Sequence, residues 1–207
     1  MGGRDRGGYA VAAVLAVVGA LAVGNGVRSN VSASAPYRDY GGPRVLWKIP
    51  DGSAAPSSPP VRVEIPAIGV RARVTPVGQK ANGMVEVPPF EHSDRAGWYR
   101  HGPSPGSRGA AVLLGHYDDK RGPAVFYRLH ELKPGSLVRV TRRDGRTLTF
   151  RVDAKEQVPK TRFPGKRVYG NVRYAGLRLV TCGGAYDRKE RSYRDNIIVY
   201  AHMVKKR

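Results

Sequence analysis

The sequence is poor in cysteine and in acidic residues, and both shortages limit what the chain can be. It has 207 residues and a single cysteine, Cys182, so no intramolecular disulfide can form and disulfide-stapled folds are excluded. Lysine and arginine total 36 against 16 aspartate and glutamate residues, a formal net charge of +20. Such a charge suits nucleic acid, anionic lipid head groups or anionic wall polymers, although it also keeps a domain soluble without any partner.

Sequence patterns typical of metal centres are missing. No set of histidine, cysteine and acidic residues has the spacing of a zinc site. No acidic cluster of the kind that holds calcium is present. We therefore expect neither a metal nor a cofactor.

Only one long apolar run occurs, and it lies near the N-terminus. Arg4 and Arg6 precede a run rich in alanine and valine from Tyr9 to Val27. The run is just long enough to cross a bilayer, and the arginines predict that residues 1–8 stay in the cytoplasm. We predict a single-pass anchor over residues 9–27 with the rest of the chain outside the cell. A cleaved signal peptide is the alternative, because Ala33-Ser34-Ala35 fits a cleavage site.

Residues 28–60 have the composition of a flexible linker. Serine, alanine, proline and glycine dominate, most clearly in residues 51–60, and such a tract buries too little apolar surface to order itself. The remaining residues, 61–207, are enough for one domain with its own core.

Short strand-like segments separated by turn residues fill this domain. The alternating or apolar segments are Val61–Ile65, Val70–Val74, Ala110–Leu114, Leu137–Val140, Leu148–Val152, Leu177–Thr181 and Ile197–Ala201. Asp144-Gly145 between two of them predicts a hairpin. Helical signals are few and short, at about 93–99, 124–130 and 164–169. The pattern favours a mainly β sandwich or closed barrel.

Three residues that can carry acyl-transfer chemistry stand at strand ends, where catalytic side chains are often placed. His116 follows one apolar strand, Cys182 follows another, and Arg194 precedes the last. A thiol with an ordinary pKa near 8.5 is only a few per cent thiolate at pH 7, and an imidazole can take its proton. A guanidinium stays charged and can stabilise the oxyanion formed at a carbonyl.

Each assignment has an alternative. A free cysteine can be an inert buried side chain, and Asp118 or Asp119 can either orient the imidazole or form a solvated turn. Arg188 and Arg191 compete with Arg194 for the oxyanion role.

The combination of motifs resembles the sortase family, and most closely the class F sortases of actinobacteria. The resemblance covers about Val61 to Met203. It rests on Gly97-Trp-Tyr99 leading to Gly106, Leu114-Gly-His116, Phe126-Tyr-Arg-Leu-His-Glu-Leu-Lys-Pro-Gly135, Leu179-Val-Thr-Cys-Gly-Gly184, and Tyr193-Arg-Asp-Asn196 before Val199-Tyr-Ala201. Each piece alone is weak, while their order and spacing together are specific.

This resemblance implies a closed eight-stranded β-barrel with a few short helices and a cysteine transpeptidase activity. Cys182 would attack the Thr carbonyl of a Leu-Pro-x-Thr-Gly-like sorting motif, and His116 would protonate the leaving amine. Arg194 would stabilise the oxyanion, and Thr181 would help line the substrate site. The implied partners are secreted surface proteins carrying the motif, an amine from a peptidoglycan precursor, and the membrane through the N-terminal helix; no nucleic acid is expected.

Two other functions remain open. A cysteine hydrolase would use the same thioester and resolve it with water. A non-catalytic, membrane-tethered basic barrel would bind anionic wall polymers, and its binding would weaken steeply with salt.

Overall fold

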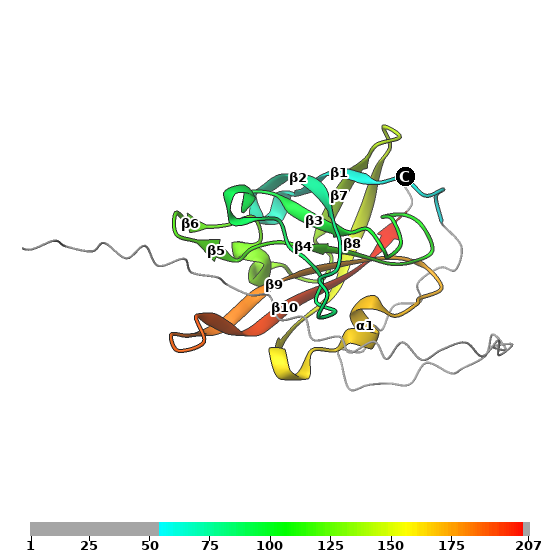
Figure 1. Cartoon of the computed structure of the whole chain (residues 1–207). Coiled ribbons are helices and arrows are strands. Elements are labelled where there is room, and N and C mark those ends of the chain that lie inside the picture. Colours follow the sequence, from blue (N-terminus) through cyan, green and yellow to red (C-terminus); the bar gives the residue numbers. More distant parts are fainter. Residues whose placement is uncertain (1–53, 205–207) are drawn as a thin grey trace, which may run out of the picture.

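Eight strands within residues 54–204, the part of the chain that the computed structural model describes, close into a barrel (Figure 1). They are β1 (Pro60–Ile65), β2 (Val70–Val77), β3 (Ala96–Tyr99), β4 (Gly109–Leu114), β7 (Leu137–Arg142), β8 (Thr147–Pro159), β9 (Ala175–Asp187) and β10 (Ser192–Val204). Their order is β1-β2-β3-β4-β9-β10-β8-β7, and β7 pairs with β1 to close the ring. Two neighbouring pairs, β2–β3 and β4–β9, are parallel. The prediction of a mainly β, closed eight-stranded barrel is confirmed.

Short helices and one small sheet connect the strands. The 3-10 helices are η1 (Pro66–Ile68), η2 (Phe90–His92), η3 (Tyr127–Glu131) and η4 (Lys160–Arg162); α1 is Gly165–Tyr169, and β5 (Asp118–Asp119) pairs with β6 (Gly122–Pro123). The predicted helix at 93–99 is wrong, because Ala96–Tyr99 is β3. Its partners are β2 and β4, and these non-local pairs cannot be seen in a local pattern.

The barrel has two apolar layers. Alternation in β1 and β7 places every second side chain inside, where Val63, Val138 and Val140 belong to the main core. β4, β9 and β10 are instead apolar on both faces. Their outward side chains form a second cluster that includes Val180 and Ile198 and that packs against Val168, Val85, Phe163 and Tyr169 from the connecting segments. A side chain on this outer face is therefore buried as well.

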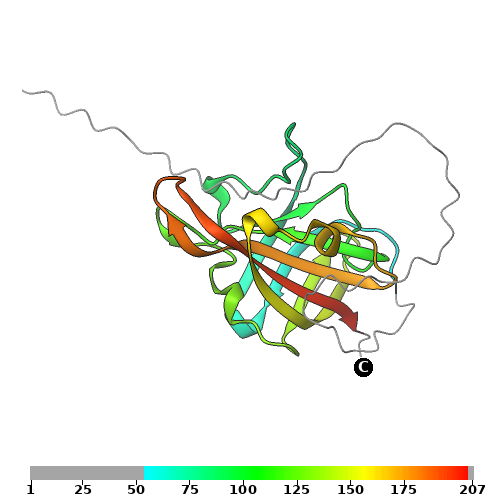
Figure 2. The ribbon, with the colours of Figure 1, turned by 90° about the horizontal axis from the view of Figure 1, so that it is seen from below.

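β9 and β10 form a hairpin longer than the sequence pattern predicts. Each strand has 13 residues, and Figures 1 and 2 show the ribbon extending beyond the rest of the barrel. The pairing shifts between Tyr193 and Asp195, which face Tyr186 and Gly183. This bulge changes which residues of β10 stand opposite those of β9.

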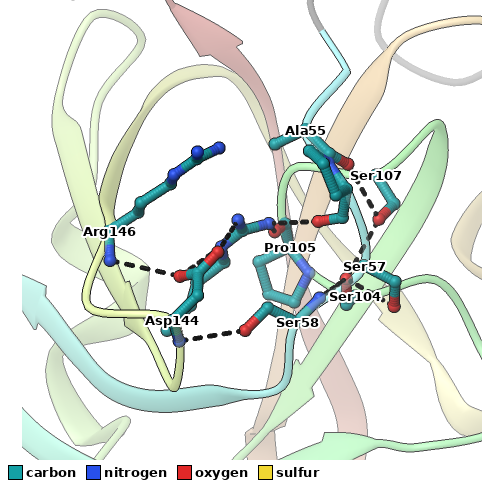
Figure 3. A network of polar contacts seen from close by, with 10 residues as sticks. Ala55, Ser57, Ser58, Ser104, Pro105, Ser107, Asp144 and Arg146 are labelled. Atoms are coloured by element: carbon teal, nitrogen blue, oxygen red, sulfur yellow. Dashed lines mark hydrogen bonds and ion pairs between the residues drawn. The ribbon is translucent and has the colours of Figure 1, made fainter.

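Residues 54–59, which the composition assigns to the linker, lie docked on the barrel. The anchor for them is Arg142, whose buried guanidinium hydrogen-bonds the carbonyls of Pro56 (2.8 Å) and Pro105 (3.3 Å) and pairs with Asp144. Serine hydroxyls extend this network, with Ser58 accepting from the Asp144 amide at 3.2 Å (Figure 3). Polar partners on the barrel thus hold a segment that has little apolar surface of its own.

The predicted anchor at 9–27 and most of the predicted linker, 28–53, lie outside the described residues. Among residues 54–204, no helix is long and apolar enough to cross a membrane.

Candidate active site

His116 comes just after β4, and Cys182 lies within β9, the parallel neighbour of β4. β4 pairs with β9 so that Leu114 faces Val180, and the Gly115 amide continues the ladder with a 3.1 Å bond to the Val180 carbonyl. His116 and Cys182 each come two residues after this pair. Because side chains alternate along a strand, both share the outer face with Leu114 and Val180. Neighbouring strands lie about 4.8 Å apart, which brings the imidazole and the thiol into one small region.

The same row continues across the next two strands. Cys182 stands directly opposite Asn196 on β10, and Asn196 stands opposite Val158 on β8. We call these four residues, His116, Cys182, Asn196 and Val158, the cysteine row.

Burial is the main influence on the pKa of the Cys182 thiol. Cys182 is 4% exposed, and this burial raises its pKa above the ordinary value. The ammonium of Lys160, which hydrogen-bonds the thiol, lowers the pKa in part, and the charge of Asp118 raises it. Lys160 is also held by the Ser192 hydroxyl at 2.7 Å. The thiol is therefore neutral at pH 7, with one cation close enough to favour the thiolate.

The His116 ring is held by the segment between β2 and β3. It is 3% exposed, its Nε2 lies 2.6 Å from the Pro88 carbonyl, and Phe90 stacks on it at 4.4 Å between ring centroids. Burial lowers its pKa, against the raising effects of the Pro88 carbonyl, Asp119 and Asp118. A carbonyl only accepts, so Nε2 carries a hydrogen and Nδ1 is the basic nitrogen of the neutral ring.

The two aspartates after His116 have different partners. Asp119 pairs with Arg121 and accepts a hydrogen bond from the Ser93 hydroxyl at 2.5 Å. These two contacts hold the pKa of Asp119 far below its usual range. Asp118 accepts from the Tyr193 hydroxyl. Both raise the His116 pKa through their charge, while the hydrogen bond that orients the ring comes from Pro88.

Arg194 lies within the bulge, between Tyr193 and Asp195, and not in the cysteine row. Its side chain is 67% exposed and forms an ion pair with Asp187, with Nη2–Oδ2 at 3.0 Å. Arg188 and Arg191, the competing candidates, are also exposed on the hairpin. The register puts Cys182 and His116 on the same face of neighbouring chain segments, and the three arginines are exposed on the β9–β10 hairpin.

Thr181 is fully buried and points to the opposite side from Cys182. Its hydroxyl donates to the Gly115 carbonyl at 2.8 Å, which fastens β9 to the chain just before His116. A role in substrate binding stays a prediction.

The two glycines after the cysteine, Gly183 and Gly184, lie where a larger side chain would clash with β10. A Cβ on Gly183 would lie 2.6 Å from Ile197 Cδ1. Gly184 has a φ of 75°, and a Cβ there would lie 2.3 Å from an Asp195 carboxylate oxygen. Their small size therefore serves the bulge, which sets the register opposite Cys182.

The sequence pattern did not single out Asn196, Lys160 or Pro88 as site residues. Asn196 reaches the row through the register of a bulged hairpin, and the other two come from connecting segments distant in sequence. The one local signal for Asn196 was its place at the end of the motif Tyr193-Arg-Asp-Asn196.

Cys182, His116 and Asn196 of the cysteine row are all buried. Residues 54–204 contain no group of three or more histidine, cysteine and acidic residues that could hold a metal ion. Of two surface hollows, one of about 610 Å³ is lined by residues that include Tyr127 and Arg121, and one of about 460 Å³ by residues that include Lys80 and His92. Neither includes Cys182, so the row is covered in this conformation.

Comparisons with known proteins agree with the barrel. The family model "Sortase domain" matches residues 63–204. Similar solved structures include the lid mutant of sortase A from Corynebacterium diphtheriae (21% identity, 70% of this chain and 70% of that chain, TM-score 0.55) and sortase C from Streptococcus pneumoniae (18%, 71% and 67%, 0.55). A sortase D5 transpeptidase from Clostridium perfringens is similar too (18%, 70% and 78%, 0.52).

A search of curated proteins found no significant match. At these identities the structural likeness establishes the fold alone, and the matched structures are sortases A, C and D, so class F stays a prediction. The family model covers more than half of the sequence, and the chain therefore belongs to the sortase family.

Proposed function

We propose that this sortase is a cysteine transpeptidase that cleaves a sorting motif through a Cys182 thioester and transfers the acyl group to an amine. The observation that carries the proposal is the shared row of Cys182 and His116 on adjacent parallel strands of a sortase barrel. One thiol and one imidazole on the same buried face are the groups that acyl transfer needs.

The reaction begins from a neutral pair. Burial raises the thiol pKa and lowers the imidazole pKa, so the ion pair is a minor form at pH 7. The Cys182 proton moves to His116 Nδ1, and the Pro88 carbonyl and the two aspartate charges stabilise the imidazolium. The thiolate forms the C–S bond, the C–N bond breaks, and the imidazolium returns its proton to the leaving amine. A second amine then attacks the thioester, the C–S bond breaks as the new C–N bond forms, and the amine proton passes through His116 to the Cys182 thiolate.

Arg194 supplies the mobile cation of the site in this proposal. Its ion pair with Asp187 is exposed, and such pairs contribute about 0–1 kcal/mol. A substrate carbonyl can therefore replace Asp187 as its partner at little cost. In that position the guanidinium holds the substrate and assists the oxyanion.

The finer assignments rest on the motif resemblance. They are a class F type of sortase, a Leu-Pro-x-Thr-Gly-like motif on secreted surface proteins, and an amine from a peptidoglycan precursor. They also include a membrane anchor over residues 9–27 with the barrel on the outer side.

The test is a peptide assay with the full chain in detergent. Peptides of the form Leu-Pro-x-Thr-Gly are incubated with and without triglycine, and intact mass follows the enzyme. We expect a thioester adduct and a ligated product with wild type and neither with Cys182→Ala. Cleavage without ligation would establish the hydrolase instead. Anionic-polymer binding unaffected by Cys182→Ala, without any adduct on wild type, would favour the non-catalytic barrel.

A further inference from the structure

Asn196 is a buried polar side chain beside the cysteine, and its amide has no partner. It is 0% exposed, and neither Oδ1 nor Nδ2 makes a hydrogen bond to any residue in the described range 54–204. An unpaired buried amide destabilises the folded protein. An apolar side chain of similar size would avoid that cost, which indicates that folding is not the reason for an asparagine here.

The register places this amide on the same face as the thiol. Asn196 and Cys182 are a direct cross-strand pair, and such pairs have Cβ atoms about 4.5–5.5 Å apart on one face. Sγ is one bond from its Cβ, and Nδ2 is two bonds from its own. An acyl group on Sγ would thus have the His116 imidazole on the β4 side and the Asn196 amide on the β10 side.

We propose that the Asn196 side-chain amide donates a hydrogen bond to the carbonyl oxygen of the acyl group as Cys182 is acylated and deacylated. This inference rests on the proposed acyl transfer. When the C–S bond forms, the carbonyl π electrons move to oxygen, and the Nδ2–H group stabilises the resulting charge. Collapse of the intermediate breaks the bond to the leaving group, and no proton is transferred to or from Asn196.

A neutral donor suits this position better than a cation. A buried charge needs a paired counter-charge, whereas a carboxamide can be buried in the row and still donate when negative charge develops at the carbonyl. Arg194, exposed on the β9–β10 hairpin, then acts on the substrate from the solvent side. The two donors approach the same carbonyl from different directions.

Two reagents that both modify Cys182 separate this role from a structural one. p-Nitrophenyl acetate acylates the thiol through an oxyanion, and iodoacetamide alkylates it without one. The full-length wild type is compared with Asn196→Leu, which removes the amide at similar volume, and with Asn196→Asp, which replaces the donor by an acceptor. Asn171→Leu is the matched control, since Asn171 is exposed on a loop.

We expect Asn196→Leu and Asn196→Asp to lower the acetylation rate about a hundredfold. Alkylation of Asn196→Leu, which adds no charge beside the thiol, should change less than about threefold. The Tm of Asn196→Leu should equal or exceed that of wild type. Parallel loss of acetylation and alkylation would mean a structural role, and unchanged acetylation would also overturn the inference.

The same variants distinguish failure of the sorting activity from failure of the role proposed for Asn196. If wild type is acetylated in an Asn196-dependent way but forms no thioester with Leu-Pro-x-Thr-Gly peptides, the sorting activity fails and the amide's role stands. If peptides acylate wild type and Asn196→Leu equally fast, the sorting activity stands and the inference fails.

Discussion

Two buried polar clusters of this barrel differ in how far their hydrogen bonds are satisfied. The Arg142 cluster, formed by Arg142, Asp144, Ser58 and the carbonyls of Pro56 and Pro105, provides a partner on every side of a buried guanidinium. In the cysteine row the amide of Asn196 has no partner within the described residues, and the thiol of Cys182 is kept neutral by burial.

The contrast separates a stabilising role from a functional one. Fully satisfied buried networks rigidify a fold, whereas an unsatisfied buried group needs an explanation such as catalysis. Changes in the Arg142 cluster should therefore alter stability and leave acyl transfer intact. Changes in the row should do the reverse.

The largest effect is expected from His116→Gln. Glutamine can still donate to the Pro88 carbonyl, but it cannot take or return a proton, so thioester formation should fall about 10³-fold with a nearly unchanged Tm. Single-turnover intact mass measures the rate, and His92→Gln, on the exposed η2, is the control. A loss below tenfold would remove His116 from the proton transfer.

Arg142→Leu tests the stabilising role of the Arg142 cluster. It leaves the Pro56 and Pro105 carbonyls without their donor, and we expect a loss of about 2–4 kcal/mol in the free energy of unfolding, measured by urea titration. Limited proteolysis near residues 54–58 should accelerate, and the acetylation rate of the folded protein should stay constant. The neighbouring exposed Arg143→Leu should change little. A fall in acetylation would show that the two clusters are coupled.

Arg194→Ala should reduce kcat/KM for the peptide about a hundredfold, the scale for losing one donor to an oxyanion. Its exposed pair with Asp187 implies almost no change in stability. Steady-state ligation kinetics measure kcat/KM, and Arg188→Ala is the control. Full activity of Arg194→Ala would transfer the role to Arg188 or Arg191.

The smallest effect is expected from Lys160→Met. Loss of the ammonium removes a contribution that lowers the Cys182 pKa, so the pKa should rise further and less thiolate should exist at pH 7. The iodoacetamide rate between pH 6 and 10 should therefore shift its midpoint upward and drop several-fold at neutral pH. Arg162→Met, an exposed residue of the same helix, serves as the comparison. A midpoint that moves down or stays fixed would contradict the assignment.

Local patterns were enough to place the strands that carry the two reactive groups. The apolar run ending at Leu114 and the run ending at Thr181 are both strands, and the Asp144-Gly145 hairpin is confirmed. Only four residues form β3, which pairs with strands on both sides, and a local pattern took it for a helix.

The partner of Cys182 on β10 could not be read from spacing. Arg194 and Asn196 are two positions apart, and a bulge between Tyr193 and Asp195 determines which residue stands opposite the thiol. One residue of slippage exchanges the faces of a strand. The docked residues 54–59 were equally hidden, because their partner Arg142 is distant in sequence.

The amino-acid sequence alone determined the strand-forming segments other than β3, the single thiol and the histidine that can serve it, because these depend on residue type and short-range alternation. The tertiary structure alone set the buried amide beside that thiol, the lysine against it and the carbonyl that orients the imidazole. Those contacts join segments separated by many residues, and their geometry comes from the register and closure of the barrel.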